Sequence, residues 1–258
     1  MWEPLKPTSP PARIVLGIAF FVGVIAFWAM LTFGGVVPTM FLKDPVATFA
    51  TGIELFGEYG FVYDIAITIF RVIGGFVLAA LIAVPIGILM GAYKPVEALL
   101  EPFISFARYI PASAFIPLLI LWAGVGETQK LSLIFLGSFF QIILMVGIIV
   151  GGTRRDLVEA AYTLGASHAG VVRRVILPAA APQIAETLRL VLGWAWTYVI
   201  VAELVGADRG IGHMIMDSQR LLDTGQMIFG MVMIGLIGLI SDYLFKLANR
   251  RLYPWSVV

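Results

Sequence analysis

The stretch that decides the fold is Glu159–Pro178, EAAYTLGASHAGVVRRVILP. It is polar and basic, yet long apolar runs flank it, Leu131–Gly152 before it and Leu190–Val205 after it. Apolar runs of about this length can cross a membrane as helices. The stretch between them, called here the EAA segment (residues Glu159–Pro178), is therefore predicted to be a loop in water.

The spacing inside the EAA segment predicts a short helix, a turn and a second helix. Glu159, Ala160 and Ala161 open it with good helix formers. Gly165 permits a turn that residues with a Cβ resist, and Pro178, which lacks an N–H, favours the first turn of a new helix. Small side chains on one helix face would also let another protein approach the backbone closely.

This spacing resembles the EAA signature of bacterial ABC importer permeases: Glu-Ala-Ala, three residues, Gly, nine residues, an aliphatic residue, one residue, Leu-Pro. Val175 stands where that family more often has Ile. The resemblance implies that the segment is a coupling helix, which docks in a groove of a cytosolic ATPase subunit and carries its closure to the membrane helices. The other interpretation is an alanine-rich spacer. The residues expected to carry the coupling are Glu159, Ala160, Ala161, Gly165, Ala166, Val175, Leu177 and Pro178.

The composition independently indicates an integral membrane protein. Of the 258 residues, 60% are hydrophobic and 13% are charged, and the mean hydropathy is +0.98. Soluble domains are about half apolar and about a quarter charged. The net charge of +1 gives no sign of nucleic-acid binding, and the lack of cysteine excludes disulfides and thiolate chemistry. No P-loop motif occurs, so ATP-driven work would need a separate ATPase. No histidine pair at metal-ligand spacing occurs either, so the sequence predicts no metal site.

The apolar pattern predicts an all-α fold with six transmembrane helices. A cleaved signal peptide is the rival interpretation of the first span, but no Ala-x-Ala site follows it. Pro85 and nearby glycines predict a kinked second span with close neighbours, and Pro111 and Pro117 predict a broken third span. The expected spans are Ile14–Phe33, Phe61–Tyr93, Phe103–Gly126, Leu131–Gly152, Thr187–Val205 and Gln226–Ser241 with its flanks.

The remaining segments are predicted to connect these spans. Met1–Ala12, with four prolines, is expected to be a disordered tail. Pro45–Phe56 is expected to form a short surface helix, with Asp44 as its cap. The predicted polar turns and the wet loop are Lys94–Glu101, Glu127–Lys130 and Gly206–Gly225, and Asn249–Val258 is a short interfacial tail.

The resemblance extends beyond the EAA segment, from about Ile65 to Lys246, to the type-I (MetI-like) transmembrane domain of these permeases. Softer matches resemble the nitrate, taurine and aliphatic-sulfonate permeases. The expected domains are residues 1–60, the type-I domain at 61–248 with its coupling loop at 153–183, and a cytoplasmic tail at 249–258. The softer matches are Thr68–Phe76, Arg108–Leu118, Ala202–Leu204 with Gly210–Gly212, and Arg251–Trp255.

The distribution of basic residues predicts the orientation. With six spans both termini lie on one side, and ten of the seventeen Lys and Arg residues fall on that side against four on the other. Basic residues favour the cytosolic side. We therefore expect a multi-pass protein of the cell inner membrane with both termini and the EAA segment in the cytosol.

Charges inside spans are costly and usually face a polar cavity or pair with one another. Arg71, Arg108, Arg189 and Glu203 are the charged residues in or at the spans. One interpretation is that an arginine lines an anion path, for which Arg71, Arg108 and Glu203 are the candidates. The other is a structural ion pair, Arg71 with Glu203 in particular, or snorkelling of Arg108 and Arg189 to the interface.

Three functions are consistent with these features. The first is the permease of an ABC importer for a small solute, of the nitrate, sulfonate, taurine or bicarbonate class. Its partners would be a second permease copy, two cytoplasmic ATPase subunits that hold ATP and magnesium, a periplasmic binding protein and lipid. The second is a secondary carrier without an ATPase. The third, an intramembrane enzyme, lacks the usual cysteine or a histidine in a span. The sequence favours the first, which is a transport subunit and not an enzyme.

Overall fold

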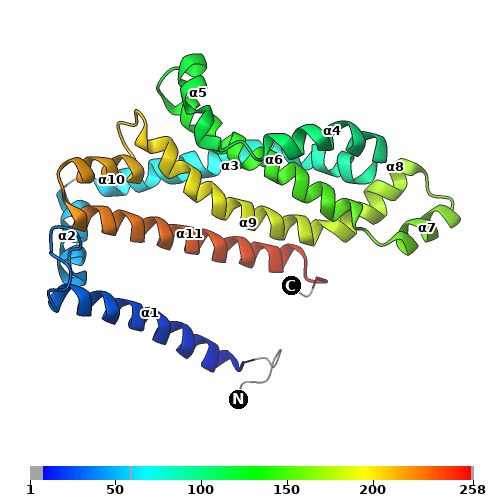
Figure 1. Ribbon diagram of the computed structural model, residues 1–258. Coiled ribbons are helices and arrows are strands. Elements are labelled where there is room, and N and C mark those ends of the chain that lie inside the picture. The colour runs from blue at the N-terminus through cyan, green and yellow to red at the C-terminus, as the bar shows by residue number, and fades with distance from the viewer. Residues whose placement is uncertain (1–7, 59, 257–258) are drawn as a thin grey trace. The chain divides into compact units, whose positions relative to one another are not determined.

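The computed structural model describes residues 8–58 and 60–256, and within them the regular elements are helices. The predicted tail Met1–Ala12 lies partly outside the described residues, and the first helix begins at Pro10. Figure 1 shows the elements in chain order. They are α1 (Pro10–Phe33), α2 (Pro45–Glu58), α3 (Phe61–Ala92), α4 (Lys94–Ala107), the 3-10 turn η1 (Ala112–Phe115), α5 (Ile116–Ala123), α6 (Glu127–Gly151), α7 (Arg155–Thr163), α8 (His168–Val171), the π-helical turn η2 (Val172–Ile176), α9 (Leu177–Leu204), α10 (Ile211–Arg220) and α11 (Thr224–Leu252).

The chain divides into two compact units. One comprises Met1–Phe61 with Ile215–Met231, and the other comprises Val62–Met214 with Val232–Val258. The smaller unit holds α1 and α2, and in it the Trp28 indole N–H donates to the Lys43 carbonyl at 3.0 Å. The larger unit contains the EAA segment and most of the apolar core.

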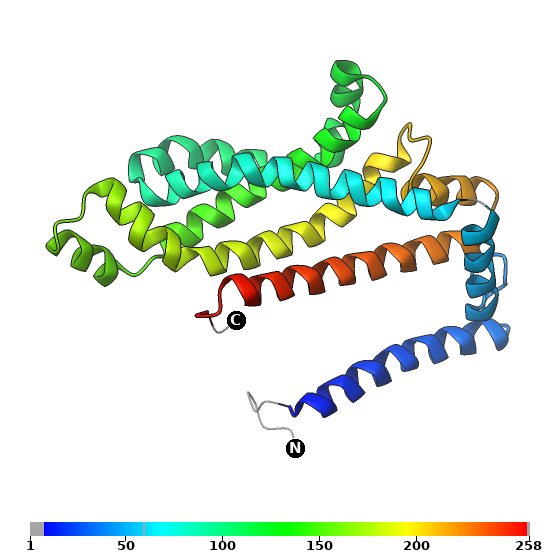
Figure 2. The same cartoon turned by 180° about the vertical axis from the view of Figure 1, so that it is seen from behind.

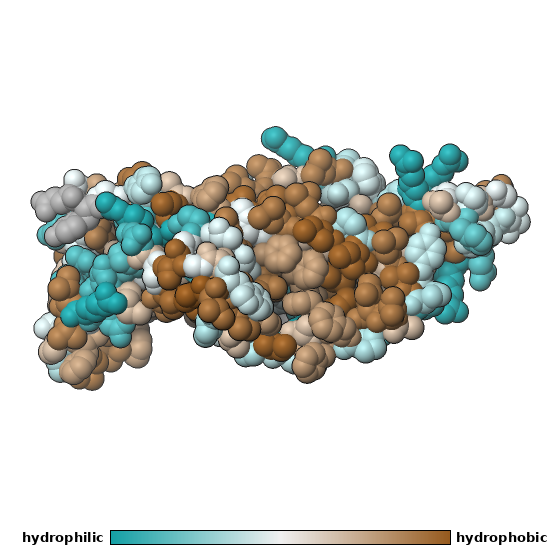
Figure 3. Space-filling model, turned by 90° about the horizontal axis from the view of Figure 1, so that it is seen from above, coloured by the Kyte–Doolittle hydropathy of each residue, from teal (hydrophilic) through white to brown (hydrophobic). Residues whose placement is uncertain are grey.

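Five helices in the described chain are long and apolar enough to span a membrane, and there are six if the bent pair α4 and α5 counts as one span. The six-helix, all-α prediction is confirmed in this sense. Long apolar helices of this kind satisfy every backbone polar group internally, as a bilayer requires. On the face shown in Figure 3, hydrophobic residues predominate and hydrophilic residues gather in separate clusters.

Close packing between α3 and α6 depends on glycine. A Cβ on Gly87 would lie 2.8 Å from the Ile143 carbonyl oxygen, and one on Gly91 would lie 2.4 Å from the Gly147 carbonyl oxygen. Small residues let membrane helices approach to backbone contact, so the predicted close neighbour of the second span is α6. On its other side α6 packs along α9, as Figures 1 and 2 both show.

The third span differs from the prediction. Lys94–Glu101, expected to be a turn, is the first part of α4. Its Pro95 lies at the N-terminal end of the helix, where a missing N–H costs no hydrogen bond. The predicted break does occur: Pro111 precedes η1, Pro117 begins α5, and the two helices meet at 84°.

Two further boundaries were wrong. Glu127–Lys130, expected to be a turn, is the first turn of α6. The fifth span does not begin near Thr187, because α8, η2 and α9 form one helical segment from His168 to Leu204. Pro178 is in the first turn of α9, as expected, but the helix preceding it does not end there.

The loop expected to be wet, Gly206–Gly225, is partly ordered and partly buried. It contains α10, and Ala207 and Ile211 are almost fully buried. Gly210 has a φ of +121°, which side-chain-bearing residues rarely adopt. The short helix predicted at Pro45–Phe56 is confirmed as α2, and Ala47 N–H donates to the Asp44 carboxylate at 2.9 Å, as expected of a cap.

Candidate functional site

The EAA segment forms the helix, turn and helix that its spacing predicts. Glu159, Ala160 and Ala161 lie in α7, and Gly165 turns the chain with a φ of +81°. Ser167 then caps α8, with its hydroxyl accepting from the Gly170 N–H at 3.2 Å. The left-handed φ explains the glycine, because a Cβ would strain the backbone there.

A second contact braces the turn. The Tyr162 hydroxyl and His168 Nδ1 lie 2.9 Å apart, and their rings meet edge to face. Just ahead of α7, Arg154 hydrogen-bonds Asp156 and so holds the pKa of that carboxyl below its usual value. Both groups of this second pair are exposed, so solvent screens their attraction and the pair contributes little to stability.

The exposed surface of the EAA segment is apolar and small at its tip. Leu164 is 87% exposed, the highest value for a large hydrophobic side chain among the described residues. Glu159, Ala160, Gly165 and Pro178 are also exposed, whereas Ala166, Val175 and Leu177 are half-buried. Ala161 is buried in the main apolar core. Ala161 therefore contacts the chain's own core and is not available to a partner.

The segment also leads directly into the membrane helices. From His168 the chain is helical to Leu204, through the single π-helical turn Val172–Ile176. At about 1.5 Å per residue, α9 alone is about 42 Å long. The second half of the EAA segment and the opposite end of α9 thus belong to one continuous helical segment.

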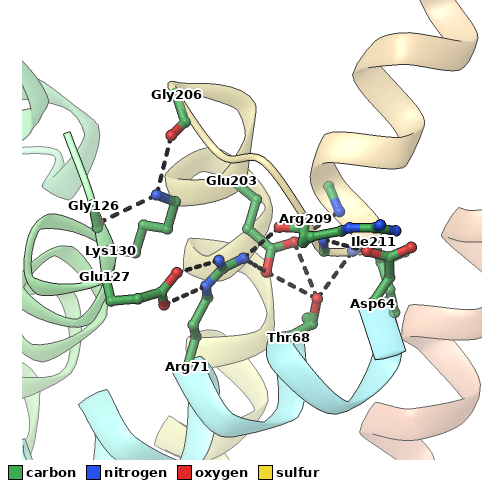
Figure 4. Close-up of polar contacts among 12 residues, drawn as sticks. Asp64, Thr68, Arg71, Gly126, Glu127, Lys130, Glu203, Gly206, Arg209 and Ile211 are labelled. Carbon is green, nitrogen blue, oxygen red and sulfur yellow. Dashed lines mark hydrogen bonds and ion pairs between the residues drawn. The ribbon is translucent and has the colours of Figure 1, made fainter. Parts of the chain in front are cut away.

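At that opposite end lies a buried polar cluster centred on Glu203 (Figure 4). Its carboxylate accepts from Arg71 Nη1 at 2.8 Å, from the Thr68 hydroxyl at 2.8 Å and from the Gly212 N–H at 2.8 Å. Thr68 in turn accepts from the Ile211 N–H at 3.0 Å. Buried charges are tolerated only when they are paired and hydrogen-bonded, and Glu203 meets both conditions.

Arg71 joins three parts of the chain. From α3 it contacts Glu203 on α9, and its Nε donates to Glu127 Oε2 on α6 at 2.8 Å. Its Nη1 also donates to the Arg209 carbonyl at 2.7 Å. Its side chain is 2% exposed, whereas that of Glu127 is 48% exposed. The geometry supports the structural ion pair that the sequence left open for Arg71 and Glu203.

Two members of the cluster were missed by the sequence interpretation. Glu127 and Lys130 were assigned to a polar turn, but they face the cluster from the first turn of α6. Lys130 is 2% exposed, and its Nζ donates to the Gly126 and Gly206 carbonyls at 3.2 Å each. The one available signal was their i, i+3 spacing, which puts both side chains on one helix face.

The Gly210-Ile211-Gly212 match also acquires a physical reason. A Cβ on Gly210 would lie 2.5 Å from the Glu203 carboxyl carbon, and one on Gly212 would lie 2.8 Å from Glu203 Cβ. Asp64 holds the same loop by accepting from the Gly210 N–H at 2.8 Å. Glycine is needed at both positions because the backbone passes too close to the Glu203 side chain to leave room for a Cβ.

Arg189 lies apart from this cluster. It donates to Glu186 on its own helix, at 2.9 Å from Nε to Oε1, and to Asp242 on α11. Its side chain is 17% exposed. An ion pair between α9 and α11 therefore accounts for Arg189, as the structural interpretation expected.

Arg108 lines a cavity of about 330 Å³ between the α4–α5 break, α6 and α9. It is the C-cap residue of α4, at the break and not at the end of a span. Its polar neighbours around the cavity are Ser113, Gln141, Thr197 and Tyr198, and Gly137 makes room for the Tyr198 ring, since a Cβ there would lie 2.6 Å from it. Arg71 and Glu203 do not line this cavity.

These features define a polytopic membrane permease. Its helices carry the exposed EAA segment at one end, the buried polar cluster at the other and a polar cavity between α6 and α9. Residues 83–254 match the family described as "Binding-protein-dependent transport system inner membrane component". The match covers most of the chain, and the protein belongs to this family of ABC importer permeases.

Similar proteins and a solved structure support this family assignment. SsuC of Bacillus subtilis (strain 168), named as an aliphatic sulfonates transport permease, is 36% identical over 250 residues, or 97% of this chain and 91% of SsuC. The taurine transport system permease protein TauC of Escherichia coli (strain K12) is 31% identical, over 97% of this chain and 94% of TauC. An inward-facing structure of the MetNI methionine ABC transporter shares the fold, with a TM-score of 0.67 at 18% identity, over 74% of this chain and 94% of that chain.

The protein is thus a transport subunit and not an enzyme, and the secondary-carrier alternative is not favoured.

Proposed function

We propose that this permease forms the translocation path for a small oxyanion in an ATP-driven importer. The class of permease follows from the family. The substrate class is supported by relatives named for sulfonates, taurine and nitrate, and by the arginine in the cavity.

The observation that carries the coupling role is the exposed EAA segment. Its tip presents Leu164 and Gly165 to solvent, and Ala160, one helical turn earlier, is exposed too. Small exposed residues let a partner approach the backbone closely. The partner we propose is a cytoplasmic ATPase subunit, which holds the ATP and magnesium. Because the segment continues into α9, closure of the ATPases would move α9 and the cavity wall together.

The proposed assembly contains two permease copies, two ATPase subunits and a periplasmic binding protein. In this assembly the EAA segment and both termini lie in the cytosol, as the excess of basic residues on that side favours. Of the three path candidates, Arg108 faces the cavity. Arg71 and Glu203 would act at the outer end of the path, by holding α3, α6 and α9 together.

The test is co-expression of the permease with candidate ATPase and binding-protein subunits from the same genome. The permease should co-purify with the ATPase, and vesicles containing the complex should accumulate a sulfonate or nitrate only with ATP and the binding protein. A catalytically inactive ATPase is the control. Uptake that proceeds without any ATPase would overturn the proposed function.

A further inference from the structure

The cavity at the α4–α5 break lies deep in the helices that surround it. Gln141 is fourteen residues, about 21 Å, along α6 from Glu127, and Thr197 is seven residues, about 10 Å, from the end of α9 at Leu204. The hydrocarbon core of a bilayer is about 30 Å thick. The cavity therefore lies within the membrane, away from both headgroup layers.

Arg108 reaches this depth because α4 begins earlier than its sequence suggests. The fourteen residues of α4 place its C-cap about 21 Å from the start of the helix. An arginine there is too far along the helix to snorkel back to the end at which α4 starts. A cation at this depth is costly and marks a functional site by default.

The electrostatics of the cavity are unbalanced. Arg108 donates to the Tyr109 hydroxyl at 2.9 Å and stacks over that ring at 4.6 Å, and no carboxylate bonds it among the described residues. No Asp or Glu lines the cavity in the described part of the chain. Arg108 is exposed to the cavity in the single chain, whereas the less exposed Arg71 and Arg189 are paired with the carboxylates of Glu203 and Asp242.

Neutral hydrogen-bonding groups complete the cavity. Ser113 from η1 and Gln141 from α6 line it with Arg108, and they offer a hydroxyl and an amide. Thr197 is less available as a donor, because its hydroxyl already donates to the Trp194 carbonyl at 2.7 Å. One cation with neutral donors suits a singly charged oxyanion, whose oxygens accept hydrogen bonds from a guanidinium.

We propose that this cavity is an anion-selective site within the membrane. In it Arg108, helped by Ser113 and Gln141, binds the sulfonate or nitrate group of the passing solute. The proposal rests on the proposed transport of a small oxyanion and adds that the permease itself, and not only a binding protein, selects the charge.

Charge selectivity can be measured without transport, because the chain contains no cysteine. The full-length permease carrying Ser113→Cys, in nanodiscs of phosphatidylcholine, is reacted with an anionic (sulfonatoethyl) or a cationic (trimethylammonioethyl) methanethiosulfonate. The mass of the permease reports each rate. Combining Ser113→Cys with Arg108→Gln should lower the anionic-to-cationic rate ratio about tenfold, since one positive charge beside the thiol acts oppositely on the two reagents. Combining it with Arg108→Lys should retain most of the ratio.

Two controls separate a local charge from a general change. Combining Ser113→Cys with Arg209→Gln should leave the anionic-to-cationic rate ratio unchanged. Combining Arg108→Gln with Asp208→Cys, whose thiol lies in the distant loop, should likewise leave the rate ratio of that thiol unchanged. Methanesulfonate should slow modification of the Ser113→Cys thiol in the protein that retains Arg108, and should not slow it in the Arg108→Gln variant. If Arg108→Gln leaves the ratio at Ser113→Cys unchanged, the anion site is wrong.

The Arg108→Gln variant also separates the anion site from the proposed importer function. In the assembled transporter, Arg108→Gln should reduce sulfonate uptake at least about tenfold while the ATPase still co-purifies, and Arg108→Lys should restore part of the uptake. ATP-dependent uptake that is undiminished in Arg108→Gln would overturn the anion site and leave the importer intact. Loss of ATP dependence in the unmodified protein would instead overturn the proposed function.

Discussion

Arg71 and Glu203 are 132 residues apart in the chain, yet Arg71 Nη1 lies 2.8 Å from Glu203 Oε1. Their side chains are 2% and 0% exposed. This pair joins α3 to α9, and Glu127 extends the connection to α6. The buried polar cluster therefore ties together the ends of the three helices farthest from the EAA segment.

The first prediction concerns this pair. Arg71→Met leaves the buried Glu203 carboxylate without its cation and should destabilise the protein by roughly 3–5 kcal/mol. Glu203→Met should cost less, because Arg71 keeps its two hydrogen bonds to Glu127. The double variant should recover much of the loss. Thermal unfolding of the purified variants is the measurement, and a double variant as damaged as the sum of the singles would contradict the pairing.

Glu127→Gln is the matched control for these variants. Glu127 also bonds Arg71, but its side chain is 48% exposed and can be hydrated when its partner changes. Its replacement should cost only about 0–1 kcal/mol. An equal loss in Glu127→Gln and Arg71→Met would mean that burial does not set the strength of these contacts.

The second prediction concerns coupling. Gly165→Leu strains a turn whose φ is +81°, and Ala160→Glu puts a bulky charge on the exposed face of α7. Neither residue lies in the core, so both variants should insert normally but lose ATPase association and uptake. Pull-down of the ATPase and uptake in the same membranes are the measurements.

Two further variants make this result specific. Arg173→Gln changes an exposed charge in the same segment and should have little effect on coupling. Ala161→Glu should instead fail to fold, because Ala161 is buried in the core. Normal association and uptake in Gly165→Leu and Ala160→Glu would show that the EAA segment is only a spacer.

The third prediction concerns orientation. Single cysteines introduced by Ala166→Cys and Asp208→Cys lie at opposite ends of the helices in a chain without other cysteine. In intact cells an impermeant maleimide should label Asp208→Cys only, and Ala166→Cys should react only after the membrane is opened. Labelling of both from outside would refute a cytosolic EAA segment.

The fourth prediction concerns the contact between α3 and α6. Gly91→Leu would place a Cβ 2.4 Å from the Gly147 carbonyl oxygen, a backbone atom that cannot move aside cheaply. Overpacking of this kind typically costs about 1–3 kcal/mol, so the melting temperature should fall. Gly17→Leu is the control, because nothing lies within 4 Å of a Cβ there. Equal melting temperatures for the two variants would argue against close packing of α3 on α6.

Much of the architecture follows from local chemistry. Apolar length predicts the spans, because a bilayer demands about twenty apolar residues in a helix. The Gly165 turn and the break at Pro111 follow from backbone preferences that act within a few residues. The EAA segment was predictable for the same reason, since its helix, turn and helix are all short-range.

The two wrongly predicted turns, at Lys94–Glu101 and Glu127–Lys130, have different causes. Lys94 and Pro95 looked like a turn, but α4 begins there, since its residues face the rest of the molecule only further along the helix and a proline fits the first turn. Glu127 and Lys130 looked like polar loop residues because their charge is visible in the sequence and their partners are not. Those partners, Arg71 on α3 and the Gly206 carbonyl, come from distant parts of the chain.

The sequence by itself determined that this is a helical membrane protein with an EAA segment, because apolar length, glycine and proline act locally. Only the tertiary structure decided which charges neutralise one another and which face a cavity. Arg71 and Arg108 are both arginines in apolar spans, and nothing near them in the sequence distinguishes their roles. Packing of α3, α6 and α9 brings carboxylates to Arg71, whereas at the bend after α4 no carboxylate of the described residues pairs with Arg108.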